Sequence, residues 1–232
     1  LNYSSFYSNT TASFRHRLWR MYANHQIGFQ GMFQSLKSTI GDVTSISKQR
    51  YERYMPYIGT GLQFDNRTIH IEADIKMNLY NWQLEEHSLS RKETEFSPDA
   101  RFYLKYSVSA TSDLSLNYRY SELLQDLRQV YDGDLFTSYR TIVNNSHSPE
   151  ADGTHSLTLR YQYSQPIKGI FFMLSALGST THRHSAYVTT LQPESGILVR
   201  TKKDADYNSE MYLVNGRFSK SFGWWKSLLG LY

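Results

Sequence analysis

Residues 68–82, TIHIEADIKMNLYNW, decide the fold that the sequence predicts. Taken at every second position, the stretch separates into an apolar set and a polar set. The apolar set is Ile69, Ile71, Ala73, Ile75, Met77 and Leu79, and the polar set is His70, Glu72, Asp74, Lys76, Asn78 and Tyr80. Only an extended strand, whose side chains alternate between two faces, sorts residues this way. Because the usual strand has only about five or six residues, this long run predicts a strand that crosses a membrane, apolar toward lipid and charged toward a wet lumen.

The two faces of this strand provide the first candidate site residues. The candidates for lipid contact are Ile69, Ile71, Ile75, Met77 and Leu79. The candidates for the lumen are His70, Glu72, Asp74 and Lys76, with Lys105, Arg119 and Arg160 on later segments. These charges either line a solute path or form a ladder, joined by Arg101, in which opposite charges on neighbouring strands contribute on the order of tenths of a kcal/mol each.

The composition fits this interpretation once the alternation is considered. Of 232 residues 40% are hydrophobic, and the mean hydropathy is -0.55. These averages are typical of a soluble protein, but a barrel strand dilutes its lipid face with as many polar residues. Aromatic residues make up 15% of the chain, including 19 Tyr, and rings with a polar tip favour the boundary between lipid and water. We expect such a girdle to contain Trp82, Tyr118, Tyr120, Tyr161, Tyr163, Trp224 and Trp225.

Several classes of protein are excluded. No run of about 18 apolar residues is present, which excludes a helical membrane span. The first residues, LNYSS, lack the features of a signal peptide and indicate a processed or excised chain. Because cysteine is absent, disulfides, thiolate metal sites and cysteine nucleophiles are excluded together. The net charge of +4 is spread along the chain, so nucleic acid is not an expected partner.

Alternating segments recur in pairs that are joined by short turns. The predicted pairs are 11–23 with 27–37, 51–64 with 68–82, 101–110 with 114–121, 154–164 with 169–181, and 208–220 with 226–232. The alternation of the first pair is mixed, which suggests a bulge or a start above the membrane. Long polar connections are expected at 38–50, 84–98, 122–153 and 182–207, and residues 122–130 fit a short amphipathic helix, either packed on the rim or acting as a lid. Short turns on one side and long loops on the other are typical of outer-membrane barrels.

The predicted fold class is therefore all-β, an antiparallel transmembrane β-barrel of about ten meander strands. We expect residues 1–232 to form a single barrel segment without a plug domain. In this layout both ends of the chain lie on the wrong side for a complete barrel. Each unpaired backbone group in lipid costs several kcal/mol. We therefore expect missing strands, a second chain or an altered environment to complete the sheet, as in a piece of a longer barrel.

A histidine pair, His182 and His184, suggests metal binding or catalysis, with His155 and Ser185 nearby in the sequence. Histidines two apart on a strand share a face and can chelate. No carboxylate of comparable placement is evident in the sequence, so we assign the pair to a solvated strand end and expect no metal site. Serine, histidine and asparagine are too plentiful for a catalytic trio to stand out, and we expect no enzyme and no cofactor.

Residues 114–145, LSLNYRYSELLQDLRQVYDGDLFTSYRTIVNN, and 155–166, HSLTLRYQYSQP, resemble the large barrels of the TonB-dependent receptor superfamily, particularly its SusC-like branch. In that family such a strand is followed by a loop with a helical patch and a Tyr-Asp element, a polar stretch and a strand of the form xxLxLxYxY. The resemblance implies that these residues are part of a barrel that houses a plug domain and shapes an extracellular binding cavity. No plug domain and no TonB-contacting segment is found in these residues.

The resemblance implies uptake of a nutrient, such as a glycan, a peptide or a metal chelate, across the bacterial outer membrane. The implied partners are outer-membrane lipid, the remaining strands or another chain, and also a plug domain, TonB and a SusD-like lipoprotein. One alternative is an outer-membrane barrel with a structural, adhesive or assembly-substrate role and no transport. Others are a barrel enzyme and a soluble β-sheet protein in which the strand at 69–79 packs on a core.

Overall fold

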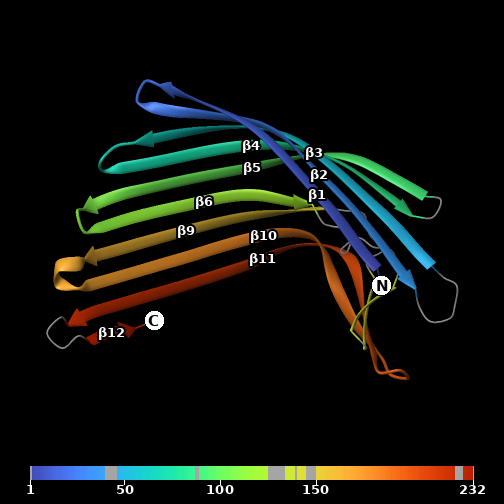
Figure 1. Ribbon diagram of the computed structural model, residues 1–232. Coiled ribbons are helices and arrows are strands. Elements are labelled where there is room, and N and C mark those ends of the chain that lie inside the picture. Colours follow the sequence, from blue (N-terminus) through green and yellow to red (C-terminus); the bar gives the residue numbers. More distant parts are fainter. Residues whose placement is uncertain are drawn as a thin grey trace.

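The computed structural model describes residues 2–39, 46–86, 89–124, 134–138, 140–144, 150–222 and 227–231. Within these ranges the chain forms one sheet of twelve strands with one short 3-10 helix (Figure 1). The elements are β1 (Asn2–Leu18), β2 (Met21–Thr39), β3 (Ile46–Asp65), β4 (Ile69–Glu86), β5 (Leu89–Ser109), β6 (Ser112–Leu124), β7 (Asp134–Ser138), β8 (Thr141–Asn144), β9 (Ala151–Gln165), η1 (Pro166–Lys168), β10 (Ile170–Gln192), β11 (Ile197–Phe222) and β12 (Ser227–Leu231). The described residues contain no helix with the length and hydrophobicity of a membrane span.

The strands follow one another as antiparallel neighbours, so the predicted meander of about ten strands is confirmed. Strands β1 to β6 pair in sequence order, and β9, β10 and β11 continue the sheet beside β6. Strand β12 pairs with β11. The sequence did not predict the β7–β8 hairpin, which lies between β6 and β9 in the chain and joins the sheet through a parallel pairing of β8 with β11.

The first hairpin turns earlier than expected. Its turn is Trp19-Arg20, not the neighbourhood of residue 24, and Trp19 has a positive φ of 54°. The register runs without interruption from Asn2 opposite Lys37 to Leu18 opposite Met21. The expected bulge is therefore absent from β1–β2. The alternation looked mixed because the residues before and after this turn belong to different strands.

The strands extend well into segments that were predicted as loops. Most of 84–98 belongs to β4 and β5, and most of 182–207 belongs to β10 and β11, which turn at 193–196. A strand keeps its ladder through backbone hydrogen bonds, which need no apolar side chains, so the polar composition of these segments was misleading. Part of the predicted helix, 122–124, is the end of β6, and its remainder, 125–130, lies outside the described residues.

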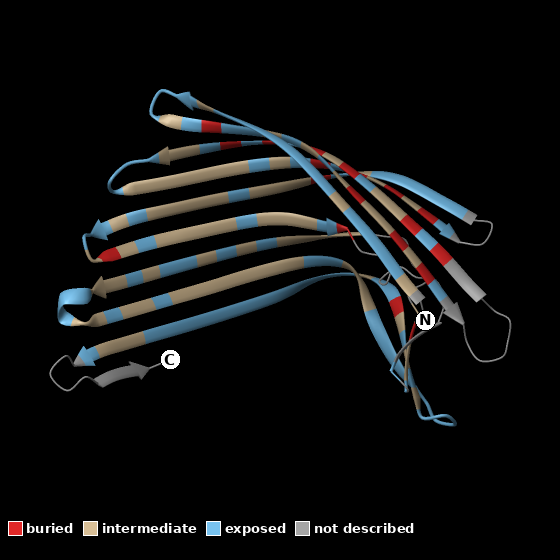
Figure 2. Cartoon of the chain, in the orientation of Figure 1, coloured by how far each residue is buried: buried red, intermediate tan, exposed pale blue. Residues whose placement is uncertain are grey.

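A small hydrophobic core lies on one face of β2, β3 and β4, where buried residues are concentrated in Figure 2. It contains Leu36, Tyr51, Met55, Tyr57, Tyr80, Trp82, Leu84, Leu124 and Val143. Trp82 is 3% exposed, so its assignment to an interface girdle was wrong. Its even position places it on the same face as His70 and Glu72, where Leu124 and Val143 help to cover it.

The described sheet is open at both long edges. Strand β1 pairs with β2 alone, and the stretch 202–217 of β11 pairs with β10 alone among the described residues. On that edge Tyr212 and Val214 are among the most exposed hydrophobic side chains. Both edges therefore offer backbone groups to which further strands can be added.

Candidate functional site

Two faces of the sheet follow from the register. We call the face that carries His70, Glu72, Asp74 and Lys76 the polar face, and the face that carries Ile75 the apolar face. On the polar face, His70 lies opposite Lys105 and Asp74 lies opposite Arg101. The register also places Arg119 beside Arg101, and Arg160 opposite Ser115 and Ser175. The structure thus brings the seven charged candidates onto one face, while their exposure to a lumen stays a prediction.

The ion pairs on this face differ from the expected ladder. Glu72 contacts His70 of its own strand, with 3.0 Å between Oε1 and Nε2. Two other pairs join neighbouring strands, Lys105 to Asp113 at 3.4 Å and Arg119 to Asp99 at 3.5 Å. Among the described side chains no salt bridge joins Glu72 or Asp74 to the predicted basic partners, and none joins Lys76 to a carboxylate. Such exposed pairs contribute about 0–1 kcal/mol, so they add little to the stability of the sheet.

Lys76 is held against an aromatic ring on this face. Its Nζ lies 3.7 Å from the centre of the Tyr57 ring, and the Tyr57 hydroxyl contacts the Thr11 hydroxyl on β1. Gly28 lies beneath Tyr57, and a Cβ at that position would collide with the ring and lie 2.6 Å from the Thr10 carbonyl oxygen. Glycine at position 28 is therefore what allows Tyr57 to cross β2 and reach β1.

The apolar face exposes large side chains where a soluble protein would cover them. Ile75 is 51% exposed, and Ile27 and Ile58 beside it are also exposed. The register places Ile69, Ile71, Ile75, Met77 and Leu79 together on this face. It also places the girdle candidates Tyr118 and Tyr161 on this face, opposite Leu157 and Leu114 respectively. Tyr120 and Tyr163 share that face, and Trp224 and Trp225 lie outside the described residues. Contact of these residues with lipid stays a prediction.

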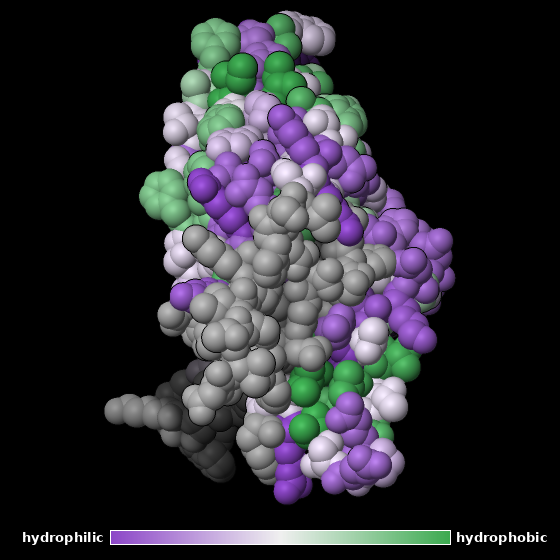
Figure 3. All heavy atoms as spheres, turned by 90° about the vertical axis from the view of Figure 1, so that its right-hand side faces the viewer, coloured by the Kyte–Doolittle hydropathy of each residue, from purple (hydrophilic) through white to green (hydrophobic). Residues whose placement is uncertain are grey.

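The end of the sheet opposite the short turns carries many hydrophilic side chains. Seen from that end, they gather in the upper middle and along the right of the described surface, and hydrophobic side chains lie near the top and at the lower right (Figure 3). There β6 separates from β5 after Ser121 while it remains paired with β9. The end of β6 reaches β3, where Arg53 donates a hydrogen bond to the Leu124 carbonyl at 3.2 Å. We call the parts of β6, β9, β10 and β11 at this end of the sheet their outer parts; they diverge together from β5.

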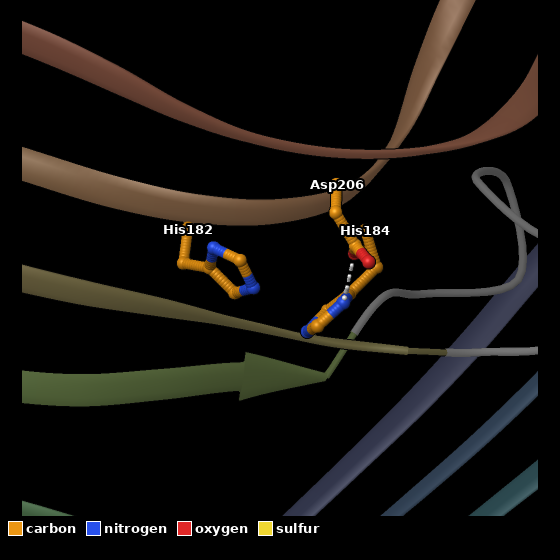
Figure 4. A group of neighbouring side chains, drawn as sticks. All are labelled: His182, His184 and Asp206. Carbon is orange, nitrogen blue, oxygen red and sulfur yellow. Dashed lines mark hydrogen bonds and ion pairs between the residues drawn. The ribbon is translucent and has the colours of Figure 1, made fainter.

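A cluster of His182, His184 and Asp206 lies on these outer parts (Figure 4). Each residue offers a nitrogen or oxygen atom, and these atoms lie within 4.8 Å of one another. His182 Nδ1 is 3.0 Å from Asn208 Oδ1, and His184 Nδ1 is 2.8 Å from Asp206 Oδ1. The two imidazole rings meet edge to face with centres 4.6 Å apart. The strand continues past this point to Gln192, so the pair is not a strand end as predicted.

Sequence reasoning found the histidines but missed Asp206 and Asn208. Asn208 lies opposite His182, and the register then shifts between Arg183 and Ser185. Arg183 pairs with Tyr207, and Ser185 pairs with Asp204. Between these pairs, two residues of β11, Ala205 and Asp206, therefore face the single residue His184 of β10. Such a β-bulge re-aims side chains. Only the pairing of the strands could have revealed the carboxylate, since Asp206 is 22 residues away from His184.

The surroundings of the cluster are acidic. Glu95 of β5 interacts electrostatically with His184, and also with Glu122 and Glu150. A buried lysine further along β11, Lys202, interacts with Glu150, and burial lowers the pKa of its amino group. Arg183 lies between the two histidines in the strand, so its side chain is on the opposite face of the sheet.

No protein-family model and no curated protein matches the sequence. Among solved structures, the copper transporter OprC is similar, with a TM-score of 0.63 and 10% sequence identity over 95% of this chain and 36% of its own. The siderophore receptor PirA from Pseudomonas aeruginosa gives a TM-score of 0.38 at 8% identity, over 92% of this chain and 53% of its own. The fold is that of an outer-membrane β-barrel, and the chain spans about a third of the transporter's length.

Proposed function

We propose that the chain is part of the barrel of a bacterial outer-membrane receptor of the TonB-dependent type, which takes up a nutrient. The observation that carries the proposal is one sheet with an exposed apolar face and a charged opposite face, on strands of up to 26 residues. In such a barrel the apolar face contacts lipid and the polar face lines the lumen. Glu72, Asp74 and Lys76 would then line the solute path or contact a plug domain.

The open edges support a place within a longer barrel. Strands β1 and β11 both lack a second neighbour along most of their length among the described residues, and open edges are not stable in hydrocarbon. The similarity to 36% of a longer transporter agrees with additional strands on either side. In this proposal the partners are those strands, a plug domain, TonB, outer-membrane lipid and, for a SusC-like receptor, a SusD-like lipoprotein. The substrate class is left as a glycan, a peptide or a metal chelate.

Energised import makes a direct prediction for cells that contain the intact protein. Surface binding and uptake of a nutrient panel are measured in matched strains with and without the gene, and with and without TonB. We expect the gene to raise uptake of one nutrient class, and loss of TonB to abolish that uptake while surface binding is retained. A plug domain encoded upstream in the same reading frame would agree with this result.

Two outcomes of this experiment would contradict the proposal. If the protein assembles in the outer membrane but changes no uptake, or if uptake persists without TonB, the proposal of energised import is wrong. The alternative barrel with a structural, adhesive or assembly-substrate role would then be favoured. Correct assembly is verified independently by heat-modifiable migration in gels.

A further inference from the structure

We infer that His182, His184 and Asp206 form a binding site for a divalent late first-row transition-metal ion. The donor set is two imidazoles and one carboxylate, and imidazole is a preferred ligand of copper, nickel and zinc. The donor atoms lie within 4.8 Å of one another. Ligands of a tetrahedral ion with bonds of about 2.0–2.1 Å lie roughly 3.4 Å apart, so small side-chain movements close the site. This metal site is an inference separate from nutrient import, and it does not depend on the proposed function.

The hydrogen bonds of the two rings indicate which nitrogen of each would bind the metal ion. An amide oxygen can only accept, so His182 carries its proton on Nδ1, which donates to Asn208 Oδ1. The Asp206 carboxylate likewise accepts from His184 Nδ1. His182 therefore keeps its Nε2 lone pair for a metal ion. His184 would share the ion with Asp206 through Nδ1, with the ion in place of the proton between them and the ring proton on Nε2. The oxygen acceptor behind the His182 imidazole is the arrangement that orients metal-binding histidines and raises their basicity.

The backbone holds the donors in place before an ion arrives. His182 and Asn208 are direct partners in an antiparallel ladder, and the bulge sets Asp206 against His184. Strand β10 is also paired with β9 as far as His182, so the strand is fixed from both sides up to this residue. Only side-chain torsions remain to be ordered on binding, which favours affinity.

The exposure of the donors indicates an exchangeable site. The side chains of His184 and Asp206 are 40% and 75% exposed, so water can complete the coordination sphere. Three protein ligands with open positions distinguish such a site from a closed structural one. The Irving–Williams order predicts the tightest binding for Cu²⁺. Hard cations such as Mg²⁺ prefer an all-oxygen shell and are not expected to compete.

Metal titration of the intact protein tests the site. The protein is purified without a histidine tag in detergent, stripped of metal and titrated with Cu²⁺ by calorimetry, with electron paramagnetic resonance to detect imidazole nitrogen. We expect His184→Ala to weaken the affinity of this site by more than about 100-fold, because even the loss of an outer hydrogen-bond partner costs about 10–100-fold. Asn208→Ala, which removes the partner of His182, is expected to fall within that range. Excess Mg²⁺ should not displace Cu²⁺.

The matched control is His155→Ala on β9, because His155 lies opposite Thr180 and bonds to Tyr118. It should leave the copper affinity of the site unchanged within about twofold, and every variant should retain heat-modifiable migration. A His182→Ala/His184→Ala double variant that is folded and still binds Cu²⁺ with wild-type affinity and nitrogen signals would overturn the assignment. Displacement of Cu²⁺ by Mg²⁺ would overturn it as well.

Discussion

Ile75→Arg should destabilise the membrane-inserted protein by about 2–4 kcal/mol, because an arginine on the lipid face near the bilayer midplane loses its hydration there. Ile75 lies on the apolar face and is 51% exposed in the described sheet. Nothing among the described residues covers the new charge. We expect slower insertion and a lower free energy of unfolding, measured by urea titration of the intact protein in lipid vesicles.

Lys76→Ile is the matched control, since it changes the next residue of the same strand on the opposite face. Its expected cost is limited to the contact with the Tyr57 ring, about 0.5–2 kcal/mol for a half-buried lysine. The two substitutions should therefore differ clearly in both insertion and stability. Equal effects would mean that the two faces of β4 are assigned wrongly.

Trp82→Ala should have an effect of similar or greater size, about 3–5 kcal/mol. The reason is different, because Trp82 is buried in the core with Tyr80 and Leu84 and its removal leaves a cavity. The substitution should lower the free energy of unfolding while insertion into vesicles still occurs. Unfolding in urea measures the first effect, and heat-modifiable migration measures the second.

Phe96→Ala removes another large aromatic side chain nearby and serves as its control. Phe96 lies on the apolar face of β5, opposite Leu79, and is exposed. Its removal leaves no internal cavity and should cost clearly less than the removal of Trp82. If the Phe96 variant were the less stable of the two, the core on the polar face would not be the one described.

Much of the fold could be predicted because the side-chain period of a strand is written directly in the sequence. The alternation at 69–79 identified both faces of β4, and the same pattern located ten of the strands. Their ends were harder to predict, because beyond the apolar band a wet hairpin leaves no hydrophobic pattern. The segment 182–207 was therefore predicted as a loop, although β10 and β11 continue through most of it.

The candidate sites show where sequence reasoning stops. The alternation of side chains along the strands predicted that Glu72, Asp74 and Lys105 share a face. Which ion pairs form on that face depends on how far each side chain extends toward its neighbours. Trp82 was predicted as a girdle residue from its place near the strand end, although its even position already placed it with His70. Asp206 joined the histidines only through the β10–β11 register and its bulge. Registers between segments 22 residues apart are not visible in one sequence.

The central claim is that β4 crosses a membrane with one face toward lipid and the other toward water, and a cysteine scan tests it most directly. The chain has no cysteine, so single cysteines at positions 69–79 of the intact protein can be spin-labelled one at a time in lipid bilayers. We predict that accessibility to oxygen, which concentrates in lipid, peaks at odd positions such as 75. Accessibility to a water-soluble nickel chelate should peak at even positions such as 74 and 76. Uniform access of the chelate along the strand, or the opposite alternation, would contradict the account.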